Sequence, residues 1–504
     1  MLNIKDLTIN LRDDDRIILK DFDFVLNDGD KVGLIGEEGN GKSLLLKAIV
    51  NRKEIESYCD ISGDIFKNND IIAYLPQSLD EKYYNYTTNE YFYERVDLNL
   101  LDYNHLYKYI SEFDLPEDIL SDNIKMKNLS GGEKIKFMLL IEILKNPTIF
   151  LFDEPSNDLD YDSLIWLENF MKELDIPLIF VSHDRKLLSN VANRIIHLEQ
   201  VKRRTEAKHT ISNNSYDDYV KKRENFIETE TNKANKDREE FDKKLGRYKK
   251  VHDSVEHSLR STKNDVEGRL LKEKMHTVKS IGRRLEKEEA NLTEKPDYEE
   301  AIDIFFDEDI KVANGKQILD FKLDELKAGD KILAKNIDLK VIGPEKICIV
   351  GKNGVGKSTL LKKIKNECQE LNLKIGYMPQ SYFEFEKTDT NAIEYLSNSF
   401  TKDEQTKASN LLGSLNFKRE EMFRNIADLS GGQKVKLFFA KMNLDMAEVL
   451  ILDEPTRNLS PLSKPEIIKA LKNYKGVIIA VSHDREFIDQ VFDKIYNLTC
   501  QGLK

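Results

Sequence analysis

The chain has 504 residues, of which 40% are hydrophobic and 33% are charged, and its formal net charge is -12. This length exceeds one hydrophobic core and predicts about three folding units at roughly 150 residues each. The apolar runs are short, the first residues lack the layout of a secretory signal, and Cys59, Cys348, Cys368 and Cys500 stand far apart. We therefore expect a cytoplasmic protein without a membrane segment, a disulfide scaffold or a zinc module.

The charge is divided unevenly along the chain. The segment Val201–Lys295 contains 25 of the 78 Lys and Arg residues and 19 of the 90 Asp and Glu residues, so it is basic while the remainder is acidic. Such a segment is typical of one that approaches a polyanion, but a solvated pair of charged helices fits equally well. Charge alone leaves both interpretations open.

Two glycine-rich loops mark the predicted phosphate-binding sites. The sequences GEEGNGKS at Gly36–Ser43 and GKNGVGKS at Gly351–Ser358 each follow an apolar run and precede a helical pattern. Glycines let successive backbone N–H groups converge on phosphate oxygens at the positive end of that helix. We expect Lys42 and Lys357 to reach the β- and γ-phosphates. The predicted nucleotide contacts in these loops are Gly36, Gly39, Asn40, Gly41, Lys42, Ser43, Gly351, Asn353, Gly354, Gly356, Lys357 and Ser358.

The second half of the chain repeats the first half. LSGGE at Leu129–Glu133 corresponds to LSGGQ at Leu429–Gln433. In each half, the signature serine and the following acidic pair are 23 positions apart, and the glutamate of that pair and a histidine are 29 positions apart. This repeat predicts two homologous domains, residues 1–200 and 299–504, joined by the basic segment 201–298.

An apolar strand ends in two carboxylates in each half, Asp153–Glu154 and Asp453–Glu454. The aspartate can hold the Mg²⁺ shell, and the adjacent glutamate can orient and deprotonate a water aimed at the γ-phosphate. We also expect the histidine after the next strand to contact the γ-phosphate and the glutamine of each Pro-Gln pair to reach the metal. The predicted catalytic residues are Glu154, Glu454, His183 and His483, and the predicted metal-site residues are Ser43, Gln77, Asp153, Ser358, Gln380 and Asp453.

The order of phosphate loop, glutamine, LSGG signature, Asp-Glu strand and histidine resembles the ATP-binding cassette superfamily over both halves. The resemblance implies an α/β fold with two tandem ATP-binding cassette nucleotide-binding domains joined by a long α-helical hairpin linker, and it implies ATP and Mg²⁺ as cofactors. It also implies a monomer in which the domains form a head-to-tail sandwich, with the signature of one domain closing on nucleotide held by the other. The signature residues implied in ATP binding are Ser130, Gly131, Gly132, Ser430, Gly431 and Gly432.

Tandem cassettes joined by a charged helical segment, without membrane spans, resemble the ABC-F proteins that act on ribosomes. Tyr216–Arg223 is similar to the start of the ABC-F linker, and Lys274–Lys287 is similar to its returning helix, with a tip at Leu245–Glu267. Helices of about 30 residues would reach some 45 Å at 1.5 Å per residue. Seven side chains of this tip are predicted to meet RNA or tRNA, although ordinary exposed loop residues remain the alternative. They are Arg247, Tyr248, Lys249, Lys250, His252, His257 and Arg260.

Three features resemble the antibiotic-resistance branch of ABC-F proteins: no large insertion in the first domain, no basic extension after Arg485, and Ser460 where the first half has Asp160. This resemblance implies that the protein binds the E site of the 70S ribosome, contacts large-subunit rRNA and displaces the peptidyl-site tRNA. A drug near the peptidyl transferase centre would then be displaced, with lincosamides, pleuromutilins and streptogramin A as the first expectation. The alternatives are a housekeeping ABC-F factor that relieves stalled ribosomes and a soluble ATPase subunit of an exporter.

Other positions depart from the usual cassette pattern. Glu37 and Glu38 lie inside the first phosphate loop, and we expect their side chains to face solvent. The stretch Asn10–Asp13 has no aromatic residue for stacking on adenine, so adenine is expected on an aliphatic or Arg surface there, whereas Phe305 and Phe306 are the candidates in the second half. Because Asp160 and Ser460 differ, the two ATP sites are expected to turn over at unequal rates.

Overall fold

The computed structural model divides the chain into two compact units, one made of Met1–Tyr216 with Glu299–Lys504 and the other of Asp217–Tyr298. Each unit is described by itself. The residues that the structure describes are 2–12, 16–99, 101–157, 159–201, 206–261, 265–289, 306–307, 309–329, 331–380, 389–397, 401–415, 417–429, 431–457 and 459–504.

A six-stranded sheet with the order β5-β6-β7-β3-β8-β9 forms the centre of the first cassette. All neighbours pair in parallel except β9, which pairs antiparallel with β8 and lies inside the range 201–298 predicted as linker. Strands buried on both faces require continuous apolar runs, which explains the composition of β6 and β7. The strands are β3 (Lys31–Ile35), β5 (Ile72–Leu75), β6 (Ile149–Asp153), β7 (Leu178–Val181), β8 (Arg194–Gln200) and β9 (Glu206–Ser212).

A separate antiparallel sheet, β2-β1-β4, covers one helix of the first cassette. Its strands are β1 (Leu2–Leu11), β2 (Arg16–Val25) and β4 (Cys59–Lys67). Helix α1 (Lys42–Ile55) shares one apolar core with this sheet and with the central strands. The other helices are α2 (Thr88–Arg95), α3 (Tyr103–Glu112), α4 (Gly131–Ile143), α5 (Tyr161–Glu173) and α6 (Arg185–Val191).

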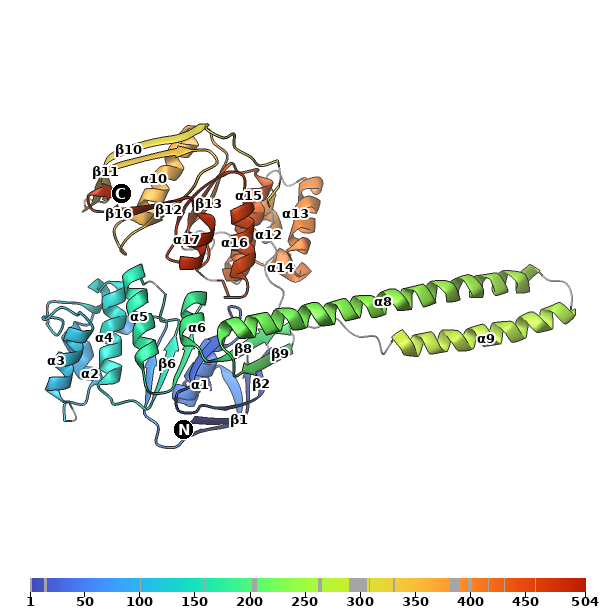
Figure 1. Ribbon diagram of the computed structural model, residues 1–504, viewed down its shortest axis with the longest axis horizontal. Helices are drawn as coiled ribbons and strands as arrows, with labels where there is room; N and C mark the ends of the chain where they lie inside the picture. The colour runs from blue at the N-terminus through green and yellow to red at the C-terminus, as the bar shows by residue number, and fades with distance from the viewer. Residues whose placement is uncertain are drawn as a thin grey trace. The chain divides into compact units, whose positions relative to one another are not determined.

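The second cassette repeats this arrangement. Its central sheet has the order β13-β14-β15-β12-β16-β17, and helix α10 packs between this sheet and the β10–β11 ribbon (Figure 1). The strands are β10 (Gln317–Ala328), β11 (Lys331–Ile342), β12 (Lys346–Val350), β13 (Ile375–Met378), β14 (Val449–Asp453), β15 (Val477–Val481), β16 (Lys494–Thr499) and β17 (Gly502–Leu503). The helices are α10 (Lys357–Glu370), α12 (Ala392–Leu396), α13 (Lys402–Ser414), α14 (Arg419–Phe423), α15 (Gly431–Leu444), α16 (Lys464–Asn473) and α17 (Arg485–Val491). The predicted pair of α/β cassettes is confirmed.

The topology of each sheet brings distant motifs to one edge. Strands β3, β6 and β7 are adjacent and parallel, and each carries a predicted site residue just beyond its carboxyl end. Strands β12, β14 and β15 do the same in the second cassette. Ligands of parallel α/β sheets bind at this edge, so the fold places the predicted residues where nucleotide chemistry can occur.

The second unit is a helical hairpin, in which α9 (Asp265–Glu289) runs beside α8 (Tyr216–Ser261) (Figure 1). Buried Phe241 and Val255 of α8 are two heptads apart, and buried Val278 and Leu285 of α9 are one heptad apart. Seven-residue spacing is typical of a coiled-coil seam. The ion pairs Arg238–Glu289, at 3.3 Å, and Lys244–Glu288 join the two helices.

The predicted position of the tip is wrong in one respect. Helix α8 has 46 residues and continues to Ser261, so a tip beginning at Leu245 is not observed. The seam extends through Val255, and burying that side chain keeps the helix intact beyond the predicted end. At 1.5 Å per residue, α8 is about 69 Å long rather than some 45 Å. Among the described residues, no helix combines the length and apolar composition that crossing a membrane requires.

Candidate active sites

Two composite sites can be defined within the unit that contains both cassettes. The first composite site is the phosphate loop Gly36–Ser43 together with the start of α15 and the segment Ser460–Lys464. The second composite site is the phosphate loop Gly351–Ser358 together with the start of α4 and Asp160. Hydrogen bonds and a shared cavity join the two cassettes at these places.

The two phosphate loops have the same backbone shape at their first glycine. Gly36 has φ 150° and Gly351 has φ 151°. A Cβ atom would lie 2.3 Å from the carbonyl oxygen of Leu198 at the first position and 2.5 Å from that of Leu498 at the second. Only glycine tolerates this conformation and this close approach, so the loop geometry accounts for the residue type.

The loop lysines are turned into their own loops. Lys42 Nζ donates to the carbonyl oxygen of Gly36 at 2.8 Å, and Lys357 Nζ donates to that of Gly351 at 2.7 Å. Burial lowers the pKa of Lys357, although Glu454 and Asp453 oppose this effect. The loop carbonyls therefore hold both ammonium groups at the place where phosphate is expected.

The remaining loop positions divide into nucleotide-facing and supporting residues. Asn40 is 1% exposed, and its Nδ2 donates to the carbonyl oxygen of Leu198 at 3.0 Å, so its side chain anchors the loop. Asn353 lines the cavity of the second composite site. Gly41 and Gly356 are the left-handed N-caps of α1 and α10. Gly39 and Gly354 also have positive φ.

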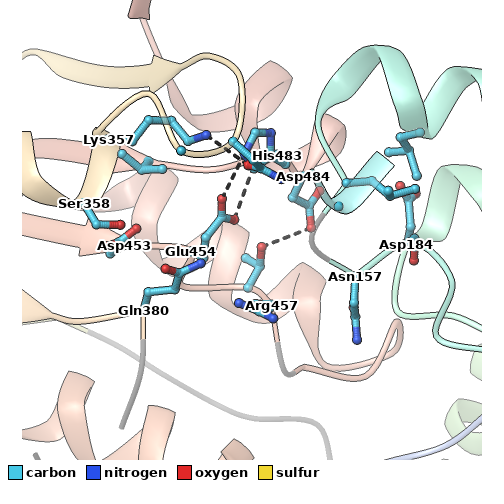
Figure 2. A pocket seen from close by; sticks show the side chains of 18 of the residues that line it. Asn157, Asp184, Lys357, Ser358, Gln380, Asp453, Glu454, Arg457, His483 and Asp484 are labelled. Atoms are coloured by element: carbon cyan, nitrogen blue, oxygen red, sulfur yellow. Dashed lines mark hydrogen bonds and ion pairs between the residues drawn. The ribbon is translucent and has the colours of Figure 1, made fainter. Parts of the chain in front are cut away.

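The predicted metal residues bring a hydroxyl to a carboxylate in both cassettes. Ser43 Oγ donates to Asp153 Oδ1 at 3.0 Å, and Tyr74, which the sequence analysis missed, donates to Asp153 Oδ2 at 3.3 Å. Ser358 and Asp453 lie next to each other (Figure 2), and burial raises the pKa of Asp453, opposed by a hydrogen bond from Ser358. Asp453 Oδ1 is buried without a hydrogen-bond partner among the described residues. Oxygen ligands with an unsatisfied carboxylate atom fit Mg²⁺, which would neutralise charge on the γ-phosphate when bound.

The two glutamines differ in placement. Gln380 lines the cavity of the second composite site (Figure 2), whereas Gln77 is exposed beyond β5. The structure therefore brings Gln380, but not Gln77, to a described cavity.

In the first cassette the predicted glutamate and histidine form a close pair. His183 Nε2 lies 2.8 Å from Glu154 Oε1. Burial acts to raise the pKa of Glu154, but His183, Lys42 and Lys464 together lower it. Glu154 is therefore a carboxylate at neutral pH and can accept a proton.

In the second cassette the same two residue types are further apart. His483 Nε2 lies 3.7 Å from Glu454 Oε1, and the backbone N–H of His483 donates to Glu454 Oε2 at 3.3 Å. Burial and the neighbouring Asp453 raise the pKa of Glu454 to about 8, and burial lowers the pKa of His483 to about 4. Glu454 is therefore protonated at neutral pH, and His483 is neutral.

Both glutamates adopt a left-handed backbone, with φ 51° at Glu154 and φ 52° at Glu454. This conformation costs a non-glycine residue roughly 1 kcal/mol or more. Its occurrence at both equivalent positions indicates that the turn aims the carboxylate rather than that one loop is irregular.

The second composite site contains a cavity of about 640 Å³ that both cassettes line (Figure 2). The first cassette contributes Gly131, Asn157 and Asp184, and the second contributes its phosphate loop with Glu454. Ser130 caps α4 through its hydroxyl, and Gly132 lies so near Ser163 that a Cβ would be 2.3 Å from its Oγ. Gly131 is thus the signature residue that faces this cavity.

At the first composite site, two carboxylates of the phosphate loop accept hydrogen bonds from the other cassette. Glu38 Oε2 accepts a hydrogen bond from the backbone N–H of Gly431 at 2.8 Å, and Glu37 Oε1 accepts hydrogen bonds from the hydroxyls of Ser460 and Ser463. The expectation that Glu37 and Glu38 only face solvent is therefore wrong, because hydroxyl and N–H donors of the other cassette meet them. Gly432 follows on α15, whereas Ser430 and Asn458 lie outside the described residues.

Lys464 is a functional candidate that the sequence analysis missed. Its Nζ is buried and lies 2.7 Å from Asp484 Oδ2, and its charge contributes to lowering the pKa of Glu154 in the other cassette, after the effects of burial, His183 and Lys42. The corresponding residue of the first half is Leu164. A lysine at a position where the repeat has a leucine was the signal that could have identified it.

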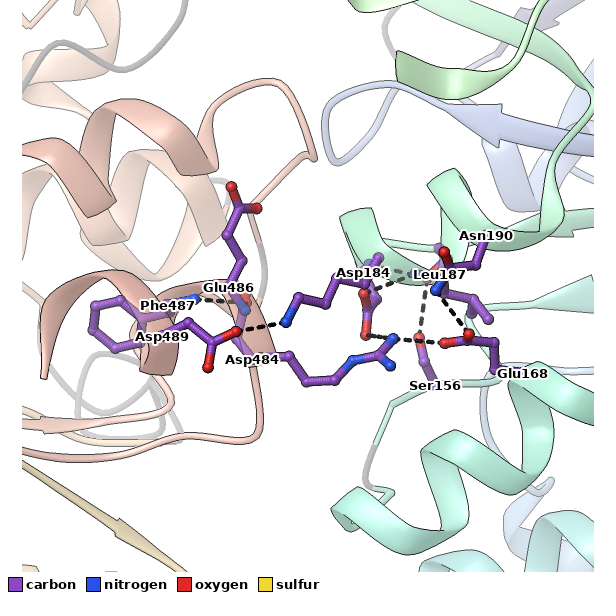
Figure 3. A network of polar contacts seen from close by, with 12 residues as sticks. Ser156, Glu168, Asp184, Leu187, Asn190, Asp484, Glu486, Phe487 and Asp489 are labelled. Carbon is purple, nitrogen blue, oxygen red and sulfur yellow. Dashed lines mark hydrogen bonds and ion pairs between the residues drawn. The ribbon is translucent and has the colours of Figure 1, made fainter. Parts of the chain in front are cut away.

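Ion pairs also join the helices that follow the two histidine loops (Figure 3). Figure 3 shows Asp489 and Glu168 in contact with cations of the opposite cassette, and Glu486 is paired with Arg185 as well. The pairs are Arg185–Glu486 at 2.6 Å, Lys186–Asp489 at 2.6 Å and Arg485–Glu168 at 2.9 Å. These contacts connect α6 and α5 with α17.

The residues expected to meet adenine have other contacts in the structure. Arg12 Nε pairs with Asp60 Oδ1 at 2.8 Å, so its guanidinium is engaged, whereas Arg16 Nη2 donates to the carbonyl oxygen of Gly39 at 3.1 Å. Arg16 is therefore the arginine beside the first phosphate loop.

Phe306 is partly buried and packs against the core of the second cassette. Its ring contacts Phe439 and Tyr474, with centroids 6.0 Å and 4.8 Å away. Phe305, the other candidate, lies outside the described residues.

The seven predicted RNA-contacting residues all lie within α8, not in a loop. Tyr248 is half-buried, and a Cβ at Gly282 of α9 would lie 2.6 Å from its Oη, so its ring packs in the seam between the helices. His252 lies 3.4 Å from Asp253, and Arg260 pairs with Glu256 at 2.6 Å. Exposed side chains remain at Arg247, Lys249, Lys250, His257 and Arg260.

Two phosphate loops, two Asp-Glu strand ends and two signature helices that face the opposite cassette define a tandem ATP-binding cassette ATPase that uses ATP with Mg²⁺. The sequence pattern described as ABC transporter matches residues 19–157 and 334–457, which is more than half of the chain. The chain belongs to this family and, within it, to the ABC-F type.

Several curated proteins are similar over nearly the whole chain. ABC transporter F family member 5 from Arabidopsis thaliana is 28% identical, with 95% of this chain and 72% of that protein covered. ATP-binding protein Uup from Buchnera aphidicola subsp. Acyrthosiphon pisum is 31% identical, with 95% and 77% covered.

Solved structures share the fold. The archaeal ribosome recycling factor aABCE1, in complex with the ribosomal stalk protein aP1, matches with a TM-score of 0.58 and 19% identity, covering 98% of this chain and 87% of that one. The structure described as ribosome-bound archaeal Pelota and ABCE1 matches with a TM-score of 0.54 and 18% identity, covering 94% and 73%. At this identity the likeness concerns the fold.

Proposed function

We propose that this ATPase binds the 70S ribosome at the E site in its ATP-closed state and protects the peptidyl transferase region by displacing an antibiotic. The observation that carries the proposal is the α8–α9 hairpin, a separate compact unit inserted in the chain between two cassettes. An ATPase pair that closes on nucleotide can use such an insert as its effector. The ribosomal partner is further supported by the shared fold with aABCE1, an archaeal ribosome recycling factor, and with ABCE1 in the structure of ribosome-bound Pelota and ABCE1.

Closure follows from the composite construction of the sites. The N–H groups at the start of α4 and α15 complete an anion cage only when the γ-phosphate of nucleotide on the other cassette is present. Lys42 and Lys357 would move from loop carbonyls to phosphate oxygens. Glu154 would accept the proton of the attacking water, whereas Glu454 must first lose its own proton.

The hairpin supplies cations for RNA. Arg247, Lys249 and Lys250 are exposed in the C-terminal third of α8, and Arg260 is exposed one residue before its end. Lys and Arg neutralise phosphates and fix position on nucleic acid without reading base sequence. These residues therefore suit contact with large-subunit rRNA and the peptidyl-site tRNA.

The partner is tested by co-sedimentation of the Glu154→Gln/Glu454→Gln protein with ribosomes in ATP. The hydrolysis-blocked protein should enter the ribosome pellet with ATP and remain in the supernatant with ADP. The matched Lys249→Glu/Lys250→Glu protein, which keeps the same catalytic substitutions, should pellet about tenfold less, with salt sensitivity reduced. Absence from the pellet in ATP would refute the ribosomal partner and favour the exporter alternative.

A housekeeping translation factor is the second candidate function. The similarity to Uup and to the Arabidopsis F family member favours it, because those names carry no resistance function. A drug panel on cells that express the wild-type chain or the Lys249→Glu/Lys250→Glu chain separates the two. Resistance that depends on these lysines supports drug displacement, whereas slow growth of deletion cells without drug supports the housekeeping role.

A further inference from the structure

The two composite sites differ in charge at two equivalent positions, one in the phosphate loop and one in the loop of the other cassette that faces it. The second position of the loop is Glu37 in the first cassette and Lys352 in the second. The position that follows the Asp-Glu strand by seven residues is Asp160 in the first cassette and Ser460 in the second. Glu37 meets Ser460 directly, and at the second composite site Asn353 and Leu159, the chain neighbours of Lys352 and Asp160, line one cavity.

The first of these pairings is built from buried donors. Ser460 and Ser463 are each 1% exposed, and both hydroxyls donate to Glu37 Oε1. The backbone N–H of Ser463 donates to Ser460 Oγ at 3.2 Å, which fixes the two hydroxyls relative to each other. A carboxylate at position 460 would face Glu37 at hydrogen-bond distance, and two like charges in a desolvated place oppose each other strongly.

The second pairing has the opposite polarity. Asp160 Oδ1 accepts a hydrogen bond from the backbone N–H of Ser163 at 3.0 Å, which caps α5. Burial acts to raise the pKa of Asp160, but the hydrogen bonds from Ser163 and the charge of Lys352 lower it. Asp160 is therefore an ionised partner for the cations of the second composite site.

We propose that Glu37 is a positioning residue for ATP hydrolysis, and that the pairs Glu37–Ser460/Ser463 and Lys352–Asp160 match each phosphate loop to its partner loop. Glu37 holds the segment Ser460–Lys464 against the first phosphate loop, and buried Lys464 at the end of this segment pairs with Asp484. Ser460 replaces aspartate because its loop meets a glutamate. The inference rests on the proposed assignment of nucleotide to the composite sites and not on the ribosomal partner.

Charge exchange in the full-length protein tests this pairing. Ser460→Asp should lower kcat/KM for ATP by about tenfold, since one tenfold step corresponds to about 1.4 kcal/mol of like-charge repulsion. Glu37→Lys/Ser460→Asp should return to within about threefold of wild type, because it recreates the Lys352–Asp160 polarity. Ser460→Ala, which loses a hydroxyl without adding a charge, should lose less than Ser460→Asp.

The reciprocal exchange keeps the test decisive if Ser460→Asp destabilises the fold. Lys352→Glu places two carboxylates together at the second composite site, and Lys352→Glu/Asp160→Ser should restore activity by copying the Glu37–Ser460 pair. Thermal unfolding without nucleotide identifies variants that fail to fold. Equal losses in Ser460→Asp and Ser460→Ala, or double variants no better than their singles, would overturn the pairing.

Failure of the nucleotide assignment gives a different result. Lys42→Ala and Lys357→Ala should each remove one ATP equivalent in equilibrium binding. If both retain two bound ATP, the assignment of nucleotide to these loops is wrong. If both lose ATP while neither charge exchange rescues activity, only the pairing is wrong.

Discussion

The two composite sites share their backbone but differ in what fills them. The second is a cavity lined by polar groups of both cassettes, whereas carboxylates of the phosphate loop cross the first. Their glutamates differ as well, because Glu154 is ionised beside His183 and burial keeps Glu454 protonated at neutral pH. A repeated fold thus supports unequal chemistry through a few side chains. We expect the first site to bind ATP weakly but to be ready to hydrolyse it.

The largest effect is expected from removing each glutamate separately. At pH 7, Glu154→Gln should lower kcat by about 100-fold, the range of a lost general base, while Glu454→Gln should lower it less than about tenfold. The pKa of Glu454 is about 8, so the proton that blocks it is lost above that pH. The residual activity of Glu154→Gln should therefore rise between pH 7 and pH 9.

Steady-state ATPase assays at both pH values measure this difference, and the double variant gives the background rate. Equal losses in the two single variants at pH 7 would contradict the proposed inequality of the sites.

A smaller effect is expected from Lys464. Lys464→Met leaves Asp484 buried without its cation, which typically costs roughly 3–5 kcal/mol. We expect a lower melting temperature and a kcat about tenfold below wild type, because Glu154 also loses a stabilising charge.

Lys464→Arg should keep most of the activity, and Lys464→Met/Asp484→Asn should recover stability without recovering kcat. Recovery of both by the double variant would show that Lys464 is purely structural.

The smallest predicted effect concerns ATP affinity at the first site. Glu38 occupies the N–H of Gly431, which is expected to meet the γ-phosphate, so Glu38→Gln should lower KM for ATP by about fivefold. The corresponding residue of the second loop is Asn353, and Asn353→Glu should raise KM. Unchanged KM in both variants would mean that nucleotide does not compete with Glu38.

The sequence predicted the features that local pattern determines. Apolar runs before the phosphate loops and before Asp153 and Asp453 are the buried parallel strands β3, β12, β6 and β14. Glycines, lysines and acidic pairs followed from the repeat because each half shows the same spacing. The roles of positions at which the two halves differ were harder to predict, since a difference at one position does not show which residue of the other cassette it contacts.

Long-range contacts and helix ends were not accessible in this way. Glu37 and Ser460 are 423 positions apart, so no local pattern joins them. The end of α8 depends on a seam with α9 that continues through Val255. Tyr248 fits between the two helices because Gly282 of α9 has no side chain at the point of contact. Charge and aromatic content alone placed Tyr248 on the RNA-facing surface, although tertiary packing places it between helices.

The ion pairs between α6 and α17 join two cassettes of one chain, which makes the association of the two cassettes independent of protein concentration. Arg185 and Arg485 keep the two cassettes next to each other through ion pairs that involve no residue of either phosphate loop. Within one chain, each half meets the other at an effective concentration on the order of millimolar or more. The association of the two cassettes therefore does not depend on protein concentration. Nucleotide needs only to reorient two cassettes that are already in contact.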